Sequence, residues 1–345
     1  MPLLVLSDAD VRKLLTYPDC VAVMRDALVA LASGQADQPL RSVARLAGAP
    51  GLLGLMPSYL AAGSSESGSD SESGSGSDSD EGAYGLKAIT INPANPGRGL
   101  DVHLGTVMVF DGQTGEPRVL LNGSAVTEIR TAAMSVLATD VLGRPGAADL
   151  AVIGTGVQAR AHILAFSQTR PLDRIRVAGR SPVKATDLAA DLRPHVSADI
   201  IGCRSVAEAL AGADIVVTVT SSAVPVVERG WIADGAHINA VGACQAAARE
   251  LDGATVAAAA LFADRRESLE AESGDYLIAR AEGLVGADHL RGELGQVLTG
   301  AAPGRLGAEE ITLFESLGLG VEDLAAAQHI SRQATAAGAG QWVDF

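Results

Sequence analysis

Residues 149–161 read D-L-A-V-I-G-T-G-V-Q-A-R-A, and the fold class can be inferred from this stretch. The apolar run that ends at Gly154 predicts a buried strand, and the residues after Gly156 predict a helix. The spacing Gly154-x-Gly156-x-x-Ala159 is typical of a dinucleotide-binding turn, because the glycines allow a tight turn and a close approach of the backbone to a pyrophosphate. The N-terminus of the helix attracts the same anion. No G-K-[ST] follows, which excludes a mononucleotide P-loop.

The alternation of strand and helix extends well beyond this turn. A long helix is expected from Ser124 to about Leu142, and short apolar runs then alternate with helical segments. Such runs indicate a parallel sheet that is covered by helices on both faces. The expected strands are A-D-L-A-V-I-G (148–154), I-R-V-A-G (175–179), A-D-I-I-G (198–202), D-I-V-V-T-V-T (214–220), H-I-N-A-V-G (237–242), L-F-A-D (261–264) and I-T-L-F-E-S (311–316).

The two ends of the chain predict a second, mixed unit. A capping box and helical periodicity identify the helices, and turn chemistry separates the strands. The expected helices are 8–15, 19–33 and 321–337, and the expected strands are 86–91, 106–111 and 118–122. The sequence therefore predicts an α/β protein in which a dinucleotide-binding domain (126–308) is inserted between two pieces of an α+β domain (1–125 and 309–345).

Residues 61–83 differ in composition from the rest of the chain. They consist mainly of Ser, Gly and six acids without a base, and the whole chain has a net charge of −15. Such a segment cannot bury a core, so we expect a disordered loop. A tolerated surface insertion explains it, since loop-closure entropy grows slowly with length. A regulatory or partner-binding acidic segment is the alternative.

Composition and charge exclude several classes of partner. The strong negative charge and an aromatic content of 3% argue against binding to nucleic acid or to an anionic membrane surface. Cys20, Cys203 and Cys244 lie far apart without C-x-x-C spacing, which argues against disulfides and a structural zinc site, and no other metal is expected. The N-terminus has no basic region before its apolar residues, and the apolar runs are too short for a membrane span. We expect a cytoplasmic protein.

The end of the second expected strand distinguishes between the two nicotinamide dinucleotides. An NAD-specific site places an acid about twenty residues after the glycines, where it binds the ribose 2′-hydroxyl. Here the sequence is A-G-R-S, with Arg180 and Ser181 and no acid, which favours the 2′-phosphate of NADP(H); NAD(H) is the alternative. The cofactor contacts that we expect are Gly154, Thr155, Gly156, Val157, Gln158, Arg180, Ser181, Thr220, Ser221, Val241, Gly242 and Ala243.

Several stretches together resemble the ornithine cyclodeaminase/mu-crystallin family over nearly the whole chain except the acidic insert. They are Q-P-L-R, L-G-L-M-P-S-Y, G-L-K-A-I-T, T-E-I-R-T-A-A-M-S, G-T-G-V-Q-A, H-I-N-A-V-G-A, E-S-G-D and F-E-S-L-G-L-G-V-E-D. The resemblance implies a homodimer, with a Rossmann domain inserted in a substrate-binding and dimerisation domain. It also implies that basic residues of the latter domain hold a substrate α-carboxylate over the nicotinamide.

Three basic residues match these motifs: Arg41 in Q-P-L-R, Lys87 in G-L-K and Arg130 in E-I-R-T-A-A. Arginine binds a carboxylate with two hydrogen bonds, and lysine adds a mobile charge or a proton. Lys87 lies in an apolar strand, where an unpaired charge would be costly. We expect Lys87 and Arg130 to be catalytic and all three to bind substrate. His103, in D-V-H-L-G-T, is a candidate wall residue or a structural histidine.

The stretch N-A-V-G-A-C (239–244) bears on the direction of the reaction. In deaminating members of the family that this chain resembles, an aspartate lies two residues after this glycine, and here the position holds Cys244. A thiol with a pKa of about 8.5 is a poor general base unless it is activated. Reduction of a preformed cyclic imine has no such need, because the enzyme mainly orients the substrate carboxylate and the nicotinamide.

The sequence therefore favours an NAD(P)H-dependent reductase of a cyclic imine carboxylate, such as 1-pyrroline-2-carboxylate or 1-piperideine-2-carboxylate. Two alternatives remain. One is an ornithine cyclodeaminase, which converts ornithine to proline and ammonia. The other is a crystallin-like protein that binds NADP without turnover, because Gln245, Ala246 and Ala247 depart from the Arg-Pro-acid run expected there.

Overall fold

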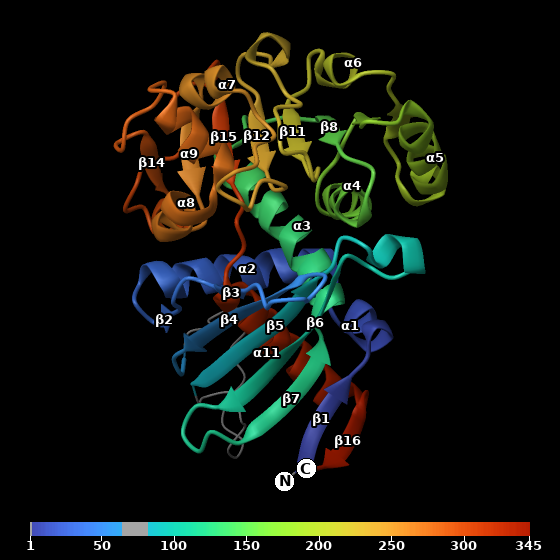
Figure 1. Ribbon diagram of the computed structural model, residues 1–345, viewed down its shortest axis with the longest axis vertical. Helices are drawn as coiled ribbons and strands as arrows, with labels where there is room; N and C mark the ends of the chain where they lie inside the picture. The colour runs from blue at the N-terminus through green and yellow to red at the C-terminus, as the bar shows by residue number, and fades with distance from the viewer. Residues whose placement is uncertain (1, 64–81) are drawn as a thin grey trace. The chain divides into compact units, whose positions relative to one another are not determined.

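The computed structural model describes residues 2–63 and 82–345, which form two compact units (Figure 1). Unit 1 consists of residues 1–130 and 319–345, and unit 2 of residues 131–318. The second boundary lies later than the expected 308, because the strand β15 (Thr312–Glu315) pairs with strands of unit 2 on both sides. Most of the predicted acidic insert, residues 64–81, lies outside the described residues.

Unit 1 is built on an eight-stranded mixed sheet with the order β16-β1-β7-β6-β5-β4-β2, in which β3 also pairs with β4. Neighbouring strands are antiparallel except β1 and β7. Its elements are β1 (Pro2–Leu6), α1 (Asp8–Leu14), α2 (Tyr17–Ala32), β2 (Ala36–Asp37), β3 (Ser42–Ala44), β4 (Leu52–Leu60), β5 (Ala83–Ile91), the 3₁₀ turn η1 (Asn95–Arg98), β6 (His103–Asp111), β7 (Pro117–Asn122), the start of α3 (Gly123–Leu142), α11 (Gly320–Ala337) and β16 (Gln341–Asp344).

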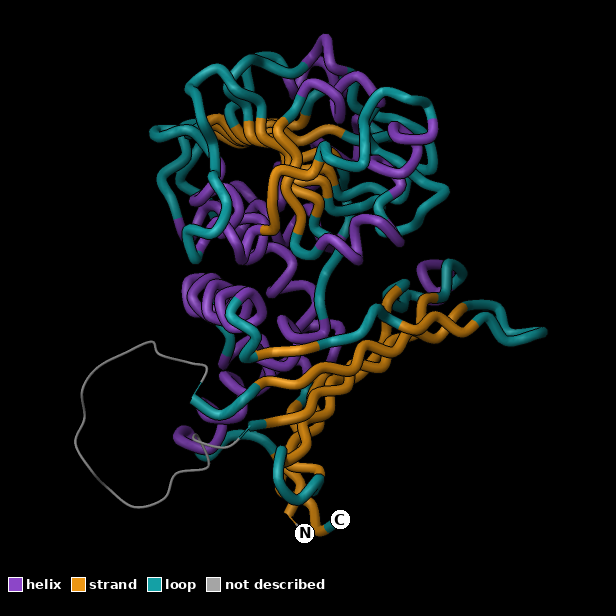
Figure 2. The backbone as a smooth tube through the Cα atoms, turned by 90° about the vertical axis from the view of Figure 1, so that its left-hand side faces the viewer, coloured by secondary structure: helices purple, strands orange, loops and turns teal. Residues whose placement is uncertain are grey.

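Among the described residues of unit 1, helices cover one face of this sheet and leave the other face open. Helix α11 packs on β4, β5 and β6 and also contacts α2, and Figure 2 shows these helices on one side of the sheet. Burial alternates along β5: Gly85, Lys87 and Ile89 face the helices, whereas Tyr84 and Leu86 face away. The side chain of Lys87 therefore points toward α11.

Unit 2 contains a sheet of eight parallel strands in the order β10-β9-β8-β11-β12-β15-β13-β14. The first five positions follow the 3-2-1-4-5 order of a Rossmann fold, in which ligands bind beyond the carboxyl ends of the strands. Its remaining elements are β8 (Asp149–Ile153), α4 (Val157–Thr169), β9 (Arg174–Ala178), α5 (Pro182–Leu192), η2 (Arg193–His195), β10 (Asp199–Gly202), α6 (Val206–Leu210), β11 (Ile215–Thr218), η3 (Arg229–Trp231), β12 (His237–Ala240), α7 (Gly253–Ala258), β13 (Ala260–Ala263), α8 (Arg266–Glu272), α9 (Gly274–Ala281), β14 (Leu290–Glu293) and α10 (Leu294–Leu298).

The predicted fold class, a Rossmann domain inserted in an α+β domain, is confirmed. All seven strands expected between residues 148 and 316 are present, as β8 to β13 and β15. The sequence analysis did not identify β14, in which a charged residue alternates with leucine and glycine, or the strands β1 to β4 and β16 of unit 1. In the described part of the chain, no helix is both long and apolar enough to cross a membrane.

Candidate functional site

Lys87 is the centre of a buried ionic cluster in unit 1. Its side chain is 3% exposed, and its ammonium donates to both carboxylate oxygens of Asp323, each at 3.1 Å. Asp323 is 1% exposed and lies in the first turn of α11. A lone buried ammonium would be costly, so the carboxylate explains how β5 accommodates a lysine among apolar residues.

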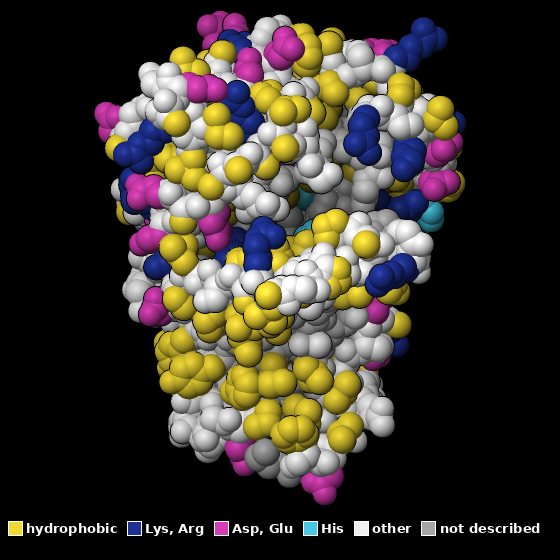
Figure 3. Space-filling view, in the orientation of Figure 1, with side chains coloured by type: hydrophobic (Ala, Val, Ile, Leu, Met, Phe, Trp, Pro, Cys, Tyr) yellow, Lys and Arg dark blue, Asp and Glu magenta, His cyan; other side chains and the backbone are white. Residues whose placement is uncertain are grey.

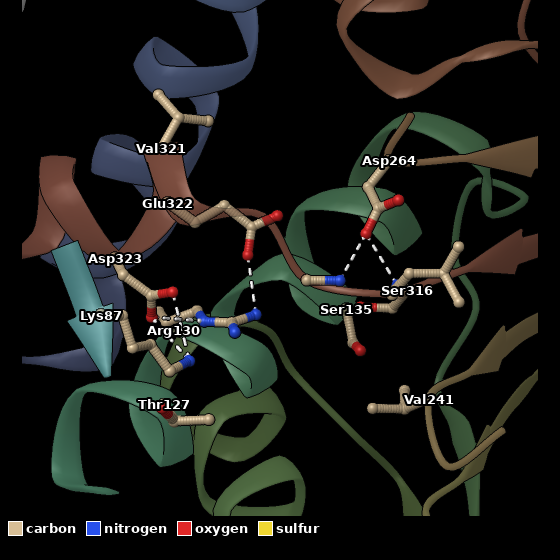
Figure 4. A network of polar contacts seen from close by, with 12 residues as sticks. Lys87, Thr127, Arg130, Ser135, Val241, Asp264, Ser316, Val321, Glu322 and Asp323 are labelled. Carbon is tan, nitrogen blue, oxygen red and sulfur yellow. Dashed lines mark hydrogen bonds and ion pairs between the residues drawn. The ribbon is translucent and has the colours of Figure 1, made fainter. Parts of the chain in front are cut away.

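Arg130, on α3, joins the same cluster from another direction (Figure 4). Its Nε donates to Asp323 Oδ1 at 3.1 Å, and its Nη1 donates to Glu322 Oε2 at 2.7 Å. Both carboxylates are buried. The structure thus places Lys87 and Arg130 in one cluster with two acids that the sequence analysis did not include. The motif G-V-E-D carried a signal for them, because the two acids directly precede the apolar run L-A-A-A at the start of the helix.

Hydrogen bonds from distant parts of unit 1 fix the first turn of α11. The side chain of Gln38 accepts a hydrogen bond from the N–H of Val321 at 2.9 Å, and Ser58 donates to the carbonyl of Gly320 at 3.1 Å. A Cβ on Gly320 would lie 3.1 Å from the carbonyl oxygen of Pro57, so a side chain there would be crowded. The positive end of the helix dipole then stabilises the adjacent acids.

The environment of Lys87 lowers the pKa of its ammonium group. Burial lowers the pKa of the Lys87 ammonium to about 8, and the charges of Arg130 and Arg41 act in the same direction, whereas the Asp323 carboxylate opposes them. Arg41 is partly buried and directly precedes β3, whose Ser42 pairs with Leu55 of β4. The strand β4 therefore lies between the segment of Arg41 and the strand of Lys87, and the charge of Arg41 still affects the pKa of Lys87.

His103 lies at the start of β6, on the same sheet face as Lys87, because His103 pairs with Ile91 and Val107 with Lys87. The surrounding protein lowers the pKa of the imidazole, and the charge of Lys87 lowers it further. The side chain nevertheless keeps much of its surface exposed. This exposure is more typical of a wall residue than of a buried structural histidine.

In unit 2, the turn after β8 has the backbone that a pyrophosphate requires. Gly154 has a φ of 138°, and a Cβ there would lie 2.8 Å from the carbonyl oxygen of Val219. Gly156 is the N-cap of α4, and a Cβ on it would meet no atom within 4 Å. Within the described residues no side chain caps this helix end, and the positive end of a helix dipole suits an anion.

The turn after β9 lies beside this glycine turn, since the N–H of Gly154 donates to the carbonyl of Ala178 at 2.8 Å. Arg180 follows with an exposed side chain. Ser181 caps α5, accepting a hydrogen bond from the N–H of Lys184 at 3.4 Å. A Cβ on Gly179 would lie 3.2 Å from Cγ2 of Thr155, so the two turns approach each other closely. The expected adenosine end of the site therefore presents a cation and a hydroxyl.

Glu250 is a buried residue that the sequence analysis missed. Its carboxylate accepts hydrogen bonds from Thr218 Oγ1 at 2.8 Å, from the N–H of Thr220 at 2.6 Å and from the N–H of Gly242 at 2.7 Å. These residues end β11 or follow β11 and β12, at the carboxyl edge of the sheet. One carboxylate thus ties together two of the expected cofactor loops. Its sequence context, A-R-E-L-D, gave no sign of this role.

The other expected contacts lie at the same edge of unit 2. Val241 and Ala243 are buried, whereas Ser221 is exposed. The thiol of Cys244 donates to the carbonyl of Val241 at 3.3 Å. Ser316, at the end of β15, has a buried hydroxyl for which the described residues provide no hydrogen-bond partner. A polar ligand at this edge would satisfy it, which agrees with the fit of a dinucleotide.

Among the described residues, no group of three or more His, Cys, Asp or Glu side chains could hold a metal ion.

Comparisons with known proteins agree with these features. The model of the ornithine cyclodeaminase/mu-crystallin family matches residues 75–338. Ketimine reductase mu-crystallin of Mus musculus is 37% identical over 291 residues, which cover 84% of this chain and 83% of that protein. Delta(1)-pyrroline-2-carboxylate reductase of Bacillus cereus is 33% identical over 344 residues, which cover 99% of this chain and 100% of that protein.

A solved structure is also similar over the full length. Delta(1)-pyrroline-2-carboxylate reductase of Thermococcus litoralis, in complex with NADH and L-proline, has a TM-score of 0.90 and 33% identity, and the match covers 99% of this chain and 100% of that one. The chain belongs to the ornithine cyclodeaminase/mu-crystallin family, as its motifs predict. It is an oxidoreductase.

The role of Glu250 can be tested by Glu250→Gln. A glutamine offers one acceptor oxygen and places an NH₂ group against backbone donors, so the two loops should separate. We expect dinucleotide binding weaker by roughly ten- to a hundredfold, because hydrogen bonds to a charged group are worth roughly 1.5–3 kcal/mol. Calorimetric titration with NADPH and NADH measures this. The control is Gln245→Ala, whose exposed side chain lies in the same loop. Unchanged affinity in a folded Glu250→Gln variant would contradict the role.

Proposed function

We propose that the protein is an NAD(P)H-dependent reductase that converts a cyclic imine carboxylate, of the 1-pyrroline-2-carboxylate or 1-piperideine-2-carboxylate type, to the cyclic amino acid. The observation that carries the proposal is the buried Lys87 ammonium next to Arg130 and within electrostatic reach of Arg41. Guanidinium and ammonium groups in one place suit a small carboxylate. The similarity to pyrroline-2-carboxylate reductases supports the same substrate class.

Each cation has a distinct task in this proposal. Arg41 and Arg130 bind the substrate carboxylate and thereby orient the imine carbon. Lys87, or a water beside it, provides the proton for the ring nitrogen. When bound, the reduced nicotinamide dinucleotide supplies the hydride. Fixing the carboxylate at more than one point restricts the rotation of a small ring, which lowers the entropic part of the barrier.

The surroundings of Cys244 support reduction rather than deamination. Oxidation of an amino acid needs a base for the ammonium proton. The Cys244 thiol donates to a backbone carbonyl and packs against the apolar core of unit 2. In the ionic cluster, both carboxylate oxygens of Asp323 accept hydrogen bonds from Lys87, and one of them also accepts from Arg130. Neither group is arranged to accept a proton from a substrate ammonium.

We further propose that NADP(H) is preferred over NAD(H). Arg180 is exposed at the end of β9, next to the glycine turn, and Ser181 provides a hydroxyl. No acid follows β9 before these two residues, so a ribose 2′-hydroxyl would lack its usual acceptor. A guanidinium compensates the charge of a 2′-phosphate.

The open face of the unit 1 sheet supports a homodimer, which we propose to be cytoplasmic. Apolar side chains gather on this face (Figure 3). The strand register places on it Leu55, Tyr59, Tyr84, Leu86, Met108, Phe110 and Leu120. Monomeric proteins rarely expose a continuous apolar area of this kind, and a second copy of the same sheet face would cover it.

The carboxylate clamp predicts the effect of Arg41→Met. We expect the KM for the imine to rise by roughly ten- to a hundredfold, because a charged hydrogen bond worth roughly 1.5–3 kcal/mol is lost, while the KM for NADPH stays unchanged. Oxidation of NADPH with a panel of cyclic imino acids measures both. Arg45→Met, at an exposed arginine of the same segment, is the control. If the wild type oxidises neither NADPH nor NADH with any imine across neutral pH, the proposed function is wrong.

The cofactor preference predicts the effect of Arg180→Asp. An acid at this position should repel a 2′-phosphate and accept a hydrogen bond from a 2′-hydroxyl. The ratio of kcat/KM for NADPH to that for NADH should therefore fall by at least about tenfold, since a new or lost charge contact is worth about 1.5 kcal/mol or more. The control is Arg193→Asp, which makes the same change in charge at the C-terminal end of α5. An unchanged ratio would show that Arg180 does not determine the cofactor preference.

The proposed interface predicts the effect of Met108→Lys. A lysine in the middle of the open face would bury a charge in the dimer, so the protein should become monomeric. Sedimentation velocity measures the change. Thr90→Lys, at an exposed position near the end of the same face, should shift the equilibrium less. A monomeric wild type at micromolar concentration would contradict the interface.

A further inference from the structure

Asp323 differs from Glu322 in what it contacts. Both acids lie in the first turn of α11 and both are buried. Glu322 accepts a hydrogen bond from Arg130, whereas Asp323 accepts from Arg130 and from the ammonium of Lys87. Asp323 is therefore the carboxylate that connects the two cations, and Figure 4 shows them converging on it.

We infer that Asp323 is a positioning residue that keeps Lys87 protonated and aligned as the proton donor to the imine nitrogen. This inference rests on the proposed reductase function. The ammonium of Lys87 has three N–H groups, and within the described residues Asp323 accepts two of them. The third remains for an atom of the substrate. Without the carboxylate, the lysine would be held by its apolar strand alone.

Proton transfer from Lys87 would accompany reduction of the imine. A bound reduced dinucleotide would supply the hydride that forms the new C–H bond at the imine carbon, and the C=N π-electrons would move to nitrogen. One N–H bond of Lys87 breaks, and its proton forms the N–H bond of the ring. Lys87 is then a neutral amine, and it regains a proton from solvent water. Asp323 neither gives nor takes a proton in this step, and an adjacent carboxylate favours return of the proton to Lys87.

The protonation of Lys87 depends on every charged group around it. Asp323 faces it from α11, Arg130 from α3, Arg41 from the segment before β3, and His103 from β6. Burial, Arg130 and Arg41 lower the pKa of Lys87 and Asp323 raises it, with a net result of about 8. Lys87 is therefore charged below about pH 8 and loses its proton as the pH rises through this value.

The test compares the pH profile of kcat/KM for the imine in the wild type, Asp323→Asn and Glu322→Gln. The wild-type rate should fall above about pH 8. Removing an adjacent opposite charge should move this basic limb down by about 1 to 3 pH units in Asp323→Asn. Glu322→Gln should leave the limb in place, because Glu322 contacts Arg130 rather than Lys87. An unmoved limb in Asp323→Asn overturns the inference.

A second measurement follows Lys87 directly. The chain has three lysines, Lys13, Lys87 and Lys184, so protein labelled with ε-¹³C-lysine gives three titratable NMR signals. Lys13 and Lys184 are exposed and serve as internal references. The Lys87 signal, assigned by Lys87→Arg, should titrate near pH 8 in the wild type and 1 to 3 units lower, about the effect of one charge, in Asp323→Asn.

The two measurements separate the possible failures. If the wild type reduces no imine, the proposed function fails, and the inference about proton donation fails with it, whatever the NMR midpoint. If imines are reduced but the Lys87 midpoint does not move in Asp323→Asn, only the inference is overturned. If the midpoint moves and the basic limb does not, Lys87 is not the donor, and the inference is again overturned.

Asp323→Glu keeps the charge and provides a variant that retains the ion pairs if Asp323→Asn does not fold. The longer side chain should leave the Lys87 midpoint near pH 8 but displace the ammonium. We therefore expect kcat to fall at least about tenfold with an unchanged basic limb, because a small displacement of a reacting group is costly. A kcat equal to that of the wild type overturns the positioning role.

Discussion

The arrangement of unit 1 depends on one buried carboxylate, that of Asp323, which holds Lys87 and Arg130 at the same time. Removing one partner of a buried ion pair costs about 3–5 kcal/mol, because the remaining charge is left without compensation. Asp323 and Lys87 are 236 residues apart in the sequence. The residues after 318 therefore have to return to the first sheet, and the dinucleotide-type unit becomes an insertion in the chain.

Unit 2 uses buried acids in a different way, to fix loops through their backbone N–H groups. Glu250 holds the loops at Thr220 and Gly242. Asp264 accepts from the N–H groups of Leu317 and Gly318 at 2.7 and 2.6 Å. All of these contacts follow carboxyl ends of strands, where irregular backbone would otherwise leave its donors unsatisfied. Acids thus order the edge at which a Rossmann fold binds its ligand.

Patterns over a few residues of the sequence predicted those features of the fold that depend on neighbouring residues. The glycine turn, the apolar strands of unit 2 and the start of α1 follow from periodicity and capping over a few residues. The partners of Lys87 do not, because they depend on a contact between β5 and α11 that brings together distant segments. The cost of a bare ammonium in an apolar strand showed that Lys87 needs a partner, but it could not identify Asp323. The sequence motifs predict that Arg41, Lys87 and Arg130 bind substrate, but they do not show that Lys87 and Arg130 also bind acids of the protein.

The shared carboxylate also bears on which form of a ligand the proposed site accepts. An imine carboxylate brings one negative charge to the arginines, and its nitrogen can accept a hydrogen bond from Lys87. The product amino acid in its ammonium form carries a positive charge at that nitrogen, close to an ammonium that Asp323 helps to keep charged. Like charges within a few ångströms repel, and they do so more strongly where water is excluded. In the proposed reaction the cluster would therefore hold the imine more tightly than the protonated amine, and the network that stabilises the fold would also promote release of the reduced product.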